Sequence, residues 1–191
     1  MRDRKEKNKN DTYEKNSGLC MPCKNGTRVA VERSKLQYER DRLYRQSEEY
    51  IYWVNLVKKV DQESWSKIQI PDQHYFVITI LIGEVFNGGF DQYFFNSSGD
   101  YYNFTKQVLM QHGEEDALSL LLRAKQLIFA DRAVPVDCEQ RRELLHEINA
   151  VQELISAELL VLEKQFIETS GRLSDLLRGL VMQYGLYTPF D

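Results

Sequence analysis

The sequence predicts an all-α fold, a compact antiparallel helical bundle preceded by a disordered or extended N-terminal arm. Apolar residues recur every three or four positions in most segments after residue 34, which is the period of an amphipathic helix. Glycine, proline and acidic residues stand between these segments, where helices commonly end and begin. No segment that could form a strand has a convincing strand partner elsewhere in the chain.

Residues 1–27 are predicted to form a flexible tail. They are rich in Lys, Asn and Asp and nearly free of apolar side chains, so they cannot offset the entropy lost on ordering. Residues 1–50 hold 13 Lys and Arg against 9 Asp and Glu, whereas residues 51–191 hold 12 against 20. We therefore expect a basic tail, 1–27, followed by a single acidic domain, 28–191. The tail could touch nucleic acid, but its interspersed acids favour a solvated arm.

The first predicted helices are an amphipathic one and a buried one. The amphipathic helix should begin near Ser34, which suits an N-cap, and fade near Asp61, before a connector or short helix. Pro71 suits the first turn of the next helix, which continues through apolar residues to Phe86. Its β-branched residues also suit a buried strand, but 16 residues is long for a strand and ordinary for a helix. We therefore expect a central buried helix.

Two further helices are marked by their ends. Residues 101–111 are predicted to be helical because Gly113 follows as a stop signal. The acids at 114–116 then open another helix, where they complement the positive end of the helix dipole. Pro135 breaks the chain after it.

A long helix is expected from Asp137, its cap, to about Thr169, and Gly171 should break it. A last helix follows, with leucines spaced by three and four residues, and Gly185 should stop it.

The long predicted helix has an apolar face and an acidic face. At 100° per residue, its core positions fall within roughly 80° of arc. They are Leu144, Ile148, Val151, Ile155, Leu159, Leu162 and Phe166. Six glutamates fall within about 140° on the opposite side, and only Glu163 lies away from them. We predict these six as a partner-binding face: Glu139, Glu143, Glu147, Glu153, Glu158 and Glu168.

Such a face is too sparse to imitate DNA alone. Carboxylates four residues apart lie about 6 Å apart along a helix, whereas each DNA strand carries one phosphate per ~3.4 Å. Imitation therefore needs a second acidic helix or a second subunit, and from pattern alone a solvated acidic face is favoured. Leu154, Leu160 and Val161 lie outside the core positions and could form a further partner surface.

The cysteines offer a weak metal hypothesis. Cys20 and Cys23 have CxxC spacing, and Cys138 with one of His74, His112 or His146 could complete four zinc ligands. No second CxxC or HxxxH pattern supports such a site, and the CxxC also lacks the strand-then-helix setting of redox motifs. We expect two ordinary thiols in the tail, and no metal or cofactor.

The chain shows no sign of a membrane segment or secretory signal. It has no run of 18 apolar residues, and its charged start is not followed by an apolar stretch. We expect a soluble cytoplasmic protein.

The stretch GEVFNGGFDQYFFNSSGD, residues 83–100, is the most distinctive. It lacks Cys, His and the usual phosphate-binding glycine patterns, although Glu84, Asp91 and His74 could meet in a catalytic site. More simply, Gly88 and Gly89 end the buried helix in a backbone shape that a side chain would forbid. The aromatic residues would then pack a corner, and residues 96–99 would form a turn.

This stretch resembles the signature of the DMP family of bacterial DNA-mimic proteins, in the C-terminal domain of that family, most members of which have no known function. The motif positions are Gly83, Glu84, Asn87, Gly88, Gly89, Phe90, Gln92, Tyr93, Asn96, Ser97, Ser98 and Gly99. The resemblance implies an all-α domain, often dimeric, without a cofactor or catalytic residues. In the defining member an acidic surface imitates the DNA backbone and occupies a DNA-binding protein such as a transcriptional repressor. The motif marks the fold and is not itself the mimic surface.

Three functional hypotheses follow. The first is a non-enzymatic protein, a homodimer in this reading, whose acidic face binds a basic partner such as a DNA-binding protein and does not bind nucleic acid directly. The second is an immunity or defence-associated protein that recognises its partner by shape, through Phe90 or Tyr93 of the aromatic corner. The third, and least favoured, is an enzyme whose carboxylates converge in space.

Overall fold

The computed structural model describes residues 21–149 and 153–190, and the chain divides into two units. The first comprises residues 1–51 with 190–191, and the second comprises residues 52–189. This division falls later in the chain than the predicted boundary at residue 28. All regular elements in the described ranges are helices, which confirms the predicted all-α class.

The first unit is built on exposed helices. Its elements are α2 (Met21–Lys24), α3 (Arg28–Tyr44) and the start of α4 (Glu48–Gln62). None of the residues of α3 is buried within the described structure. Near its end, the ring of Tyr44 contacts the rings of Tyr50 and Phe190, with centroids 5.7 and 5.6 Å away. These aromatic contacts join the beginning of α4 to the C-terminal residues of the same unit.

The predicted start of the first helix at Ser34 is wrong. Ser34 lies inside α3, where its hydroxyl donates a hydrogen bond to the carbonyl of Ala30 over 3.0 Å. The chain instead leaves the helix between Tyr44 and Glu48, and Ser47 caps α4. Its Oγ accepts a hydrogen bond from the backbone N–H of Tyr50 at 3.1 Å, as an N-cap does for the third residue of a helix. The break arises because this local cap competes with a continuous helix.

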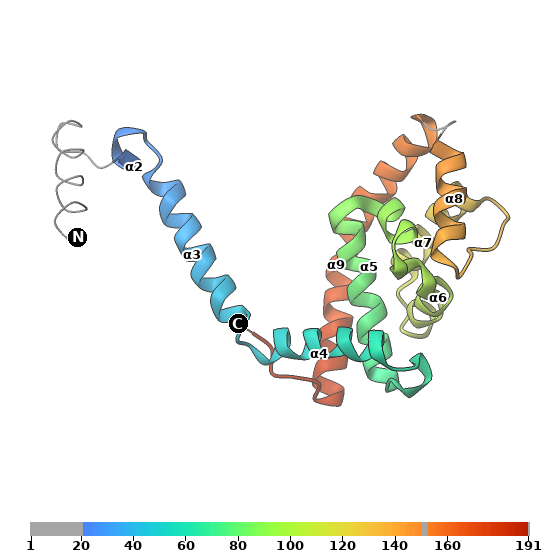
Figure 1. Cartoon of the computed structure of the whole chain (residues 1–191), viewed down its shortest axis with the longest axis horizontal. Helices are drawn as coiled ribbons and strands as arrows, with labels where there is room; N and C mark the ends of the chain where they lie inside the picture. The colour runs from blue at the N-terminus through green and yellow to red at the C-terminus, as the bar shows by residue number, and fades with distance from the viewer. Residues whose placement is uncertain (1–20, 150–152, 191) are drawn as a thin grey trace. The chain divides into compact units, whose positions relative to one another are not determined.

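The second unit surrounds one central helix. Its elements, beginning with the rest of α4, are η1 (Trp65–Lys67), α5 (Ile70–Phe95), η2 (Ser97–Tyr101), α6 (Tyr102–Gln111), α7 (Glu115–Phe129), α8 (Cys138–Asn149) and α9 (Glu153–Tyr184). Helix α5 packs against α9, η2, α6, α8 and α7, and α9 also packs against α7. Figure 1 shows α5 and α9 side by side and running in opposite directions.

The expectation of a central buried helix is confirmed by α5. Val77, Ile78 and Leu81 in its first part are completely buried, as are Phe90 and Phe94 in its last part. Each such side chain contributes about 1.5–3 kcal/mol of hydrophobic free energy relative to an exposed one. The β-branched residues lower helix propensity, but burial on every side outweighs that preference.

An aromatic cluster holds α4 and η1 against α5 and α6. Trp65 contacts Tyr101 and Phe104, with ring centroids 4.7 and 5.5 Å apart. Trp53 of α4 stacks on Phe76 of α5 at 5.8 Å. Offset and edge contacts of this kind add to the area that the rings bury, so the short η1 segment is fixed by packing.

The predictions for the next two helices agree with the structure within one residue at their starts. Helix α6 ends at Gln111, and Gly113 follows with a positive φ of 69°. Helix α7 begins with Glu115 and Asp116 in its first turn. These ends are set by backbone and dipole effects that act locally, which is why the sequence alone located them.

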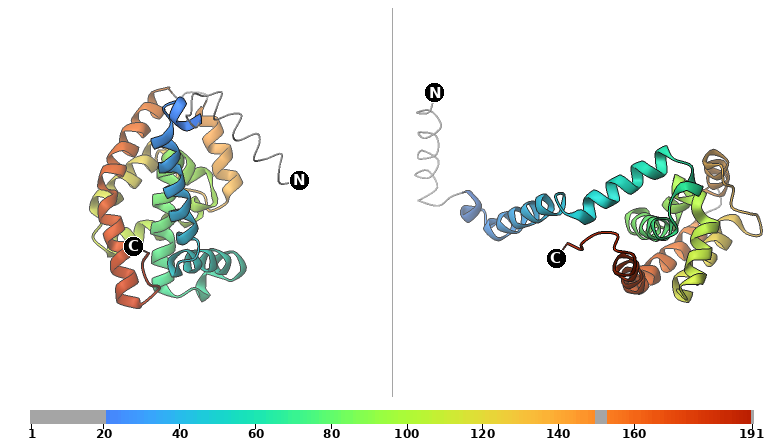
Figure 2. Two further views of the ribbon diagram at one scale, coloured as in Figure 1. Left: turned by 90° about the vertical axis from the view of Figure 1, so that its left-hand side faces the viewer. Right: turned by 90° about the horizontal axis from the view of Figure 1, so that it is seen from below.

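The prediction of one long helix from Asp137 to about Thr169 is wrong. The segment belongs to two helices, α8 and α9, which meet at one end and diverge along different axes in Figures 1 and 2. The predicted cap is confirmed, because Asp137 Oδ1 accepts a hydrogen bond from the backbone N–H of Gln140 at 2.8 Å. Gly171 does not break α9, which continues to Tyr184 because buried side chains on both sides hold the helix together.

Candidate functional site

The glycine pair of the 83–100 stretch bends α5. Gly88 has φ −164° and ψ 22°, and Gly89 has φ 81° and ψ −175°. The Gly89 backbone lies in a region that only glycine adopts readily. A Cβ atom there would also lie 2.0 Å from Oε1 of Glu163. The prediction that these glycines take a backbone shape closed to other residues is therefore confirmed at Gly89, and the helix resumes beyond it.

Glu163 of α9 caps the resumed part of α5. Its carboxylate accepts a hydrogen bond from the backbone N–H of Phe90, immediately after the bend. Burial, and then the nearby Asp91 carboxylate, raise the pKa of Glu163, while the hydrogen bond from Phe90 opposes this rise. A glutamate from one helix therefore takes the place of the missing N-cap of another.

Asp91 lies in the same place with fewer partners. Burial raises the pKa of its carboxyl group. Its Oδ1 atom is buried and has no hydrogen-bond partner among the described residues. Two carboxyl groups, Asp91 and Glu163, thus lie beside the bend, and no ion pair between described residues includes either of them.

A groove of about 510 Å³ runs between the bend in α5 and α9. We call it the kink groove. Its lining combines the two carboxyl groups with the glycines and with apolar side chains. The principal lining residues are Phe86, Gly88, Gly89, Asp91, Leu160, Glu163 and Ile167.

Polar residues of the motif form hydrogen bonds across the bend. Glu84 Oε2 accepts hydrogen bonds from Gln92 Nε2 at 2.6 Å and from Asn96 Nδ2 at 2.9 Å. Glu84 lies before the glycines, whereas Gln92 and Asn96 lie after them. The three side chains therefore connect the two halves of α5, which is a structural role.

Arg141 of α8, which the sequence analysis missed, anchors the far end of the motif. Its side chain is completely buried. Its guanidinium donates hydrogen bonds to four backbone carbonyls and to the Asp100 carboxylate. The acceptors are Phe94 O, Asn96 O, Pro135 O, Val136 O and Asp100 Oδ1. Guanidinium has five N–H donors, so each finds an acceptor.

The Arg141 anchor also explains a motif glycine. A Cβ at Gly99 would lie 2.6 Å from Nε of Arg141 and 3.0 Å from the carbonyl oxygen of Phe94. A signal for this arrangement was present in the sequence. Arg141 lies three residues before Leu144, so it continues the apolar stripe of α8 inward, where a charged side chain requires buried partners.

Phe90 and Tyr93, the predicted aromatic contacts for shape recognition, lie in the core. Both are completely buried, and Tyr93 donates a hydrogen bond to the Thr105 hydroxyl at 3.0 Å. Burial raises the pKa of the Tyr93 phenol. Partner contact through these two rings is therefore excluded in this fold. The aromatic residues exposed in this stretch are Phe86 and Phe95, with Phe95 under the Arg142 guanidinium of α8 at 4.8 Å.

The predicted acidic residues lie on two helices rather than one. Glu139 and Glu143 belong to α8, Glu158 and Glu168 belong to α9, and all four are exposed. The side chains of Glu147 and Glu153 lie outside the described part of the structure. Because α8 and α9 have different axes, the helical wheel that joined the six residues into one face does not apply.

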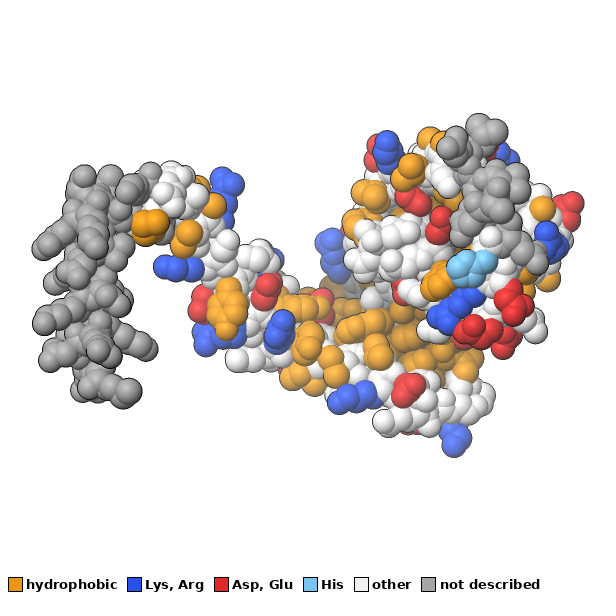
Figure 3. Space-filling view, turned by 45° about the horizontal axis from the view of Figure 1, so that its top comes forward, with side chains coloured by type: hydrophobic (Ala, Val, Ile, Leu, Met, Phe, Trp, Pro, Cys, Tyr) orange, Lys and Arg blue, Asp and Glu red, His pale blue; other side chains and the backbone are white. Residues whose placement is uncertain are grey.

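Two of these glutamates have basic neighbours. Arg142 forms an ion pair with Glu139, and Arg123 of α7 contacts Glu158 at 3.3 Å. No ion pair between described residues includes Glu143 or Glu168. On the face drawn in Figure 3, acidic side chains occur in small groups with basic side chains near some of them.

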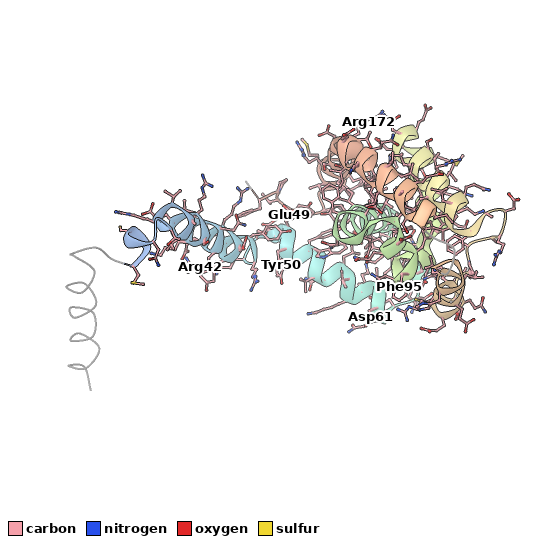
Figure 4. All side chains as sticks on the ribbon, turned by 90° about the horizontal axis from the view of Figure 1, so that it is seen from above. Arg42, Glu49, Tyr50, Asp61, Phe95 and Arg172 are labelled. Carbon is pink, nitrogen blue, oxygen red and sulfur yellow. The ribbon has the colours of Figure 1, made fainter. Side chains whose placement is uncertain are left out.

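Another arginine, Arg172, links α9 to the start of α7. It contacts Asp116 at 3.1 Å and Glu114 at 3.5 Å. Figure 4 shows Arg172 on α9 beside α7. The acids that open α7 therefore serve packing as well as the helix dipole.

The residues considered for catalysis or metal binding do not converge. His74 Nδ1 lies 3.1 Å from Nε2 of His112, whereas Glu84 accepts hydrogen bonds from side-chain amides of the motif. His74 and Glu84 share α5 ten residues apart, which is about 15 Å along a helix. Cys138 donates a hydrogen bond to the Phe95 carbonyl at 3.4 Å, and Cys20 lies outside the described residues. Within the described ranges, no group of three or more His, Cys, Asp or Glu side chains could hold a metal ion.

Fold and site together define an all-α domain whose bent central helix, α5, is capped by a glutamate of α9 at the bend and anchored by an arginine of α8 at its C-terminal end. Residues 66–184 match the family described as DMP19-like protein, and the chain belongs to this family. The match covers the central helix, the 83–100 motif and α9. No curated protein and no solved structure matches the chain. Among the described helices, none combines the length and the apolar character needed to cross a membrane.

Proposed function

We propose that this chain is a non-enzymatic protein-binding domain of the DNA-mimic type, which occupies a basic DNA-binding protein such as a transcriptional regulator. Membership of the DMP19-like family over residues 66–184 carries this proposal. In this proposal the partner meets carboxylates from α8 and α9, and the chain acts in the cytoplasm without binding nucleic acid itself.

The distribution of carboxylates supports a mimic surface made by two helices. A single row of glutamates has about half the charge density of one DNA strand. Exposed glutamates lie on both α8 and α9, so two helices in place of one can contribute carboxylates. The arginines at Glu139 and Glu158 reduce the net charge of these helices, so Glu143 and Glu168 should contribute most to the attraction.

The proposal includes a homodimer, because a second copy of the chain would add its own glutamates to the surface that the partner meets. Leu160 and Val161 of α9, which were expected outside the core, are exposed by 55% and 53%. The side chain of Leu154 lies outside the described part. A dimer formed through Val161, which does not line the kink groove, would bring two sets of glutamates together.

The test of this function is competition with DNA. The full chain is immobilised, and DNA-binding proteins that it captures at low salt are identified and purified. A duplex carrying the site of a captured protein should then displace it from the chain, because both ligands use one basic surface. Binding should also weaken steeply as salt rises from low to physiological, since charge contacts dominate it. A complex that forms equally well with the duplex present would refute mimicry.

Matched variants identify the surface. One variant replaces four predicted glutamates by glutamine: Glu143, Glu147, Glu158 and Glu168. A control variant removes four acidic charges elsewhere: Glu32, Glu39 and Glu63 become Gln, and Asp61 becomes Asn. If each exposed contact contributes about 0.5–1 kcal/mol, the first variant should bind at least about thirtyfold more weakly. Equal losses in both variants would show that only net charge matters.

A further inference from the structure

The kink groove has the shape and lining of a binding site for a side chain. Its floor is the glycine bend, where the absence of a side chain at Gly89 leaves room for the Glu163 carboxylate of α9. Three apolar residues of its wall are largely exposed, Phe86 by 51%, Leu160 by 55% and Ile167 by 45%. These apolar surfaces come from two helices and face a common space.

Within the described ranges, neither carboxyl group of this groove takes part in an ion pair. Glu163 receives the Phe90 N–H, but Asp91 has a buried oxygen that no donor reaches within the described structure. The Asp91 carboxylate lies close enough to Glu163 to disfavour the charge on Glu163. Elsewhere the fold gives a buried charge its partners, as the five acceptors around Arg141 show. Two acids without a basic partner among the described residues therefore distinguish this groove.

The chemistry of the groove fits an organic cation with an apolar stem. Divalent cations such as Ca²⁺ take six or more oxygen ligands, and two carboxyl groups supply too few. An arginine side chain carries five donors in a plane, is weakly hydrated and stacks on aromatic rings such as Phe86. Its methylene stem can lie along Leu160 and Ile167. A lysine would supply one compact, strongly hydrated charge and would use the aromatic wall less well.

We propose that the kink groove binds an arginine side chain of a protein partner, with Asp91 and Glu163 as its carboxylate ligands and Phe86 as its aromatic wall. This inference rests on the proposed function, because it assigns to the basic partner one specific point of contact. The groove would fix the register of the complex, whereas the exposed glutamates would supply long-range attraction.

A titration of the full chain with a small probe tests the inference. The probe is Nα-acetyl-arginine amide, and the matched control is Nα-acetyl-citrulline amide, which has the same shape without the charge. Binding is followed by NMR, through the amide signals of Gly88 and Gly89 and the methyl signals of Leu160 and Ile167. The arginine probe should give saturable shifts confined to these residues, and citrulline should bind at least about tenfold more weakly because it lacks the charge. Equal shifts with both probes, or no saturable shifts, would overturn the inference.

Two substitutions locate the site without removing the fold. Asp91→Asn and Glu163→Gln keep the size of each side chain, and the amide oxygen of Gln can still accept the Phe90 N–H. Each should weaken binding of the arginine probe by about tenfold, as expected for loss of one partner of a charged contact. Asp175→Asn, on the same helix but outside the groove lining and exposed, should leave probe binding unchanged. If Asp175→Asn weakens it equally, the probe responds to general charge and the inference fails.

The failure of this inference and the failure of the proposed function give different results. If the duplex displaces the captured partner but the arginine probe does not occupy the groove, mimicry stands and the groove contact is wrong. If the probe binds and no DNA-competitive partner exists, the groove contact stands without mimicry. A change of sedimentation between wild type and Asp91→Asn would show that a second copy of this chain occupies the groove, and it would also overturn the inference.

Discussion

Two parts of the 83–100 motif differ in whether buried ionisable groups have partners within the fold. At the Asp100 end, the Arg141 guanidinium is completely buried, and each of its N–H groups has an acceptor. At the Gly89 end, Asp91 and Glu163 lie near each other in a groove, and no described base is paired with them. The Arg141 arrangement leaves no donor of the guanidinium free for a ligand, whereas the Asp91 and Glu163 carboxyl groups can still accept one. The comparison separates residues that hold the fold from residues available for binding.

The largest effect is expected at the Arg141 anchor. Arg141→Met should lower the free energy of unfolding by about 3–5 kcal/mol, because it leaves four carbonyls and a carboxylate without their donor. Urea denaturation followed by circular dichroism measures this loss. Arg178→Met is the matched control, since Arg178 is exposed and its contact with Asp175 is worth about 1 kcal/mol or less. A change at Arg141 no larger than that at Arg178 would mean that the anchor adds little to the fold.

The bend at Gly89 should give the next largest effect. Gly89→Ala introduces a Cβ at φ 81° and against the Glu163 carboxylate, so it should destabilise the domain by about 2–3 kcal/mol. Adding Glu163→Ala should recover part of this loss by relieving the contact, but not the backbone strain.

Gly83→Ala is the informative control for the bend. A Cβ at Gly83 would meet no atom within 4 Å, and the residue lies inside α5. Alanine there should raise the free energy of unfolding by about 0.5–1 kcal/mol. Opposite signs for the two glycines would show that they serve different purposes. Destabilisation at Gly83 as well would point to a contact made outside this chain.

The sequence predicted the parts of the fold that depend on local interactions. Gly113 and Gly185 both follow their helices with positive φ, and Asp137 caps α8 as expected. Prediction from the sequence failed where tertiary packing outweighs the helix propensity of a residue. Gly171 costs about 1 kcal/mol in a helix interior, yet buried Phe166 and Leu173 on either side keep α9 continuous.

The kink groove was harder to predict because its parts are distant in sequence. Asp91 and Glu163 are 72 positions apart, and only the packing of α5 against α9 brings them together. One feature of the sequence did point to the kink groove. Glu163 was the single glutamate of its segment away from the acidic arc, and it is half-buried in the structure. A carboxylate that leaves the solvent side of a helix indicates a tertiary partner or a binding role.

A smaller effect is expected at Asp91. The raised pKa of this acid means that the folded state holds its proton more tightly than the unfolded state does, so stability contributed by the protonated form is lost as pH rises. Asp91→Asn should therefore stabilise the free chain at pH 7, by about 0.5–1 kcal/mol, while weakening binding. Thermal unfolding at pH 7 and near pH 4 should show this gain shrinking at the lower pH. Destabilisation at pH 7 would reveal a partner for Asp91 within the fold.

The smallest effect is expected at a pair of neighbouring histidines, His74 and His112, which lie close together as Asp91 and Glu163 do. His74 is buried against His112 and the Phe104 ring, and burial, followed by the neighbouring imidazole, lowers the pKa of His74. The neutral form is thus favoured in the folded state, so stability is complete above the ordinary histidine range and is lost as pH falls through it. His74→Gln keeps a donor and an acceptor and should flatten this dependence, changing the unfolding free energy between pH 7 and pH 5 by about 1 kcal/mol or less. NMR titration of the two imidazoles measures the same linkage directly. A His74 that titrates in the ordinary range would mean that its protonation is not linked to folding, and the contrast with the carboxyl pair would then rest on the groove alone.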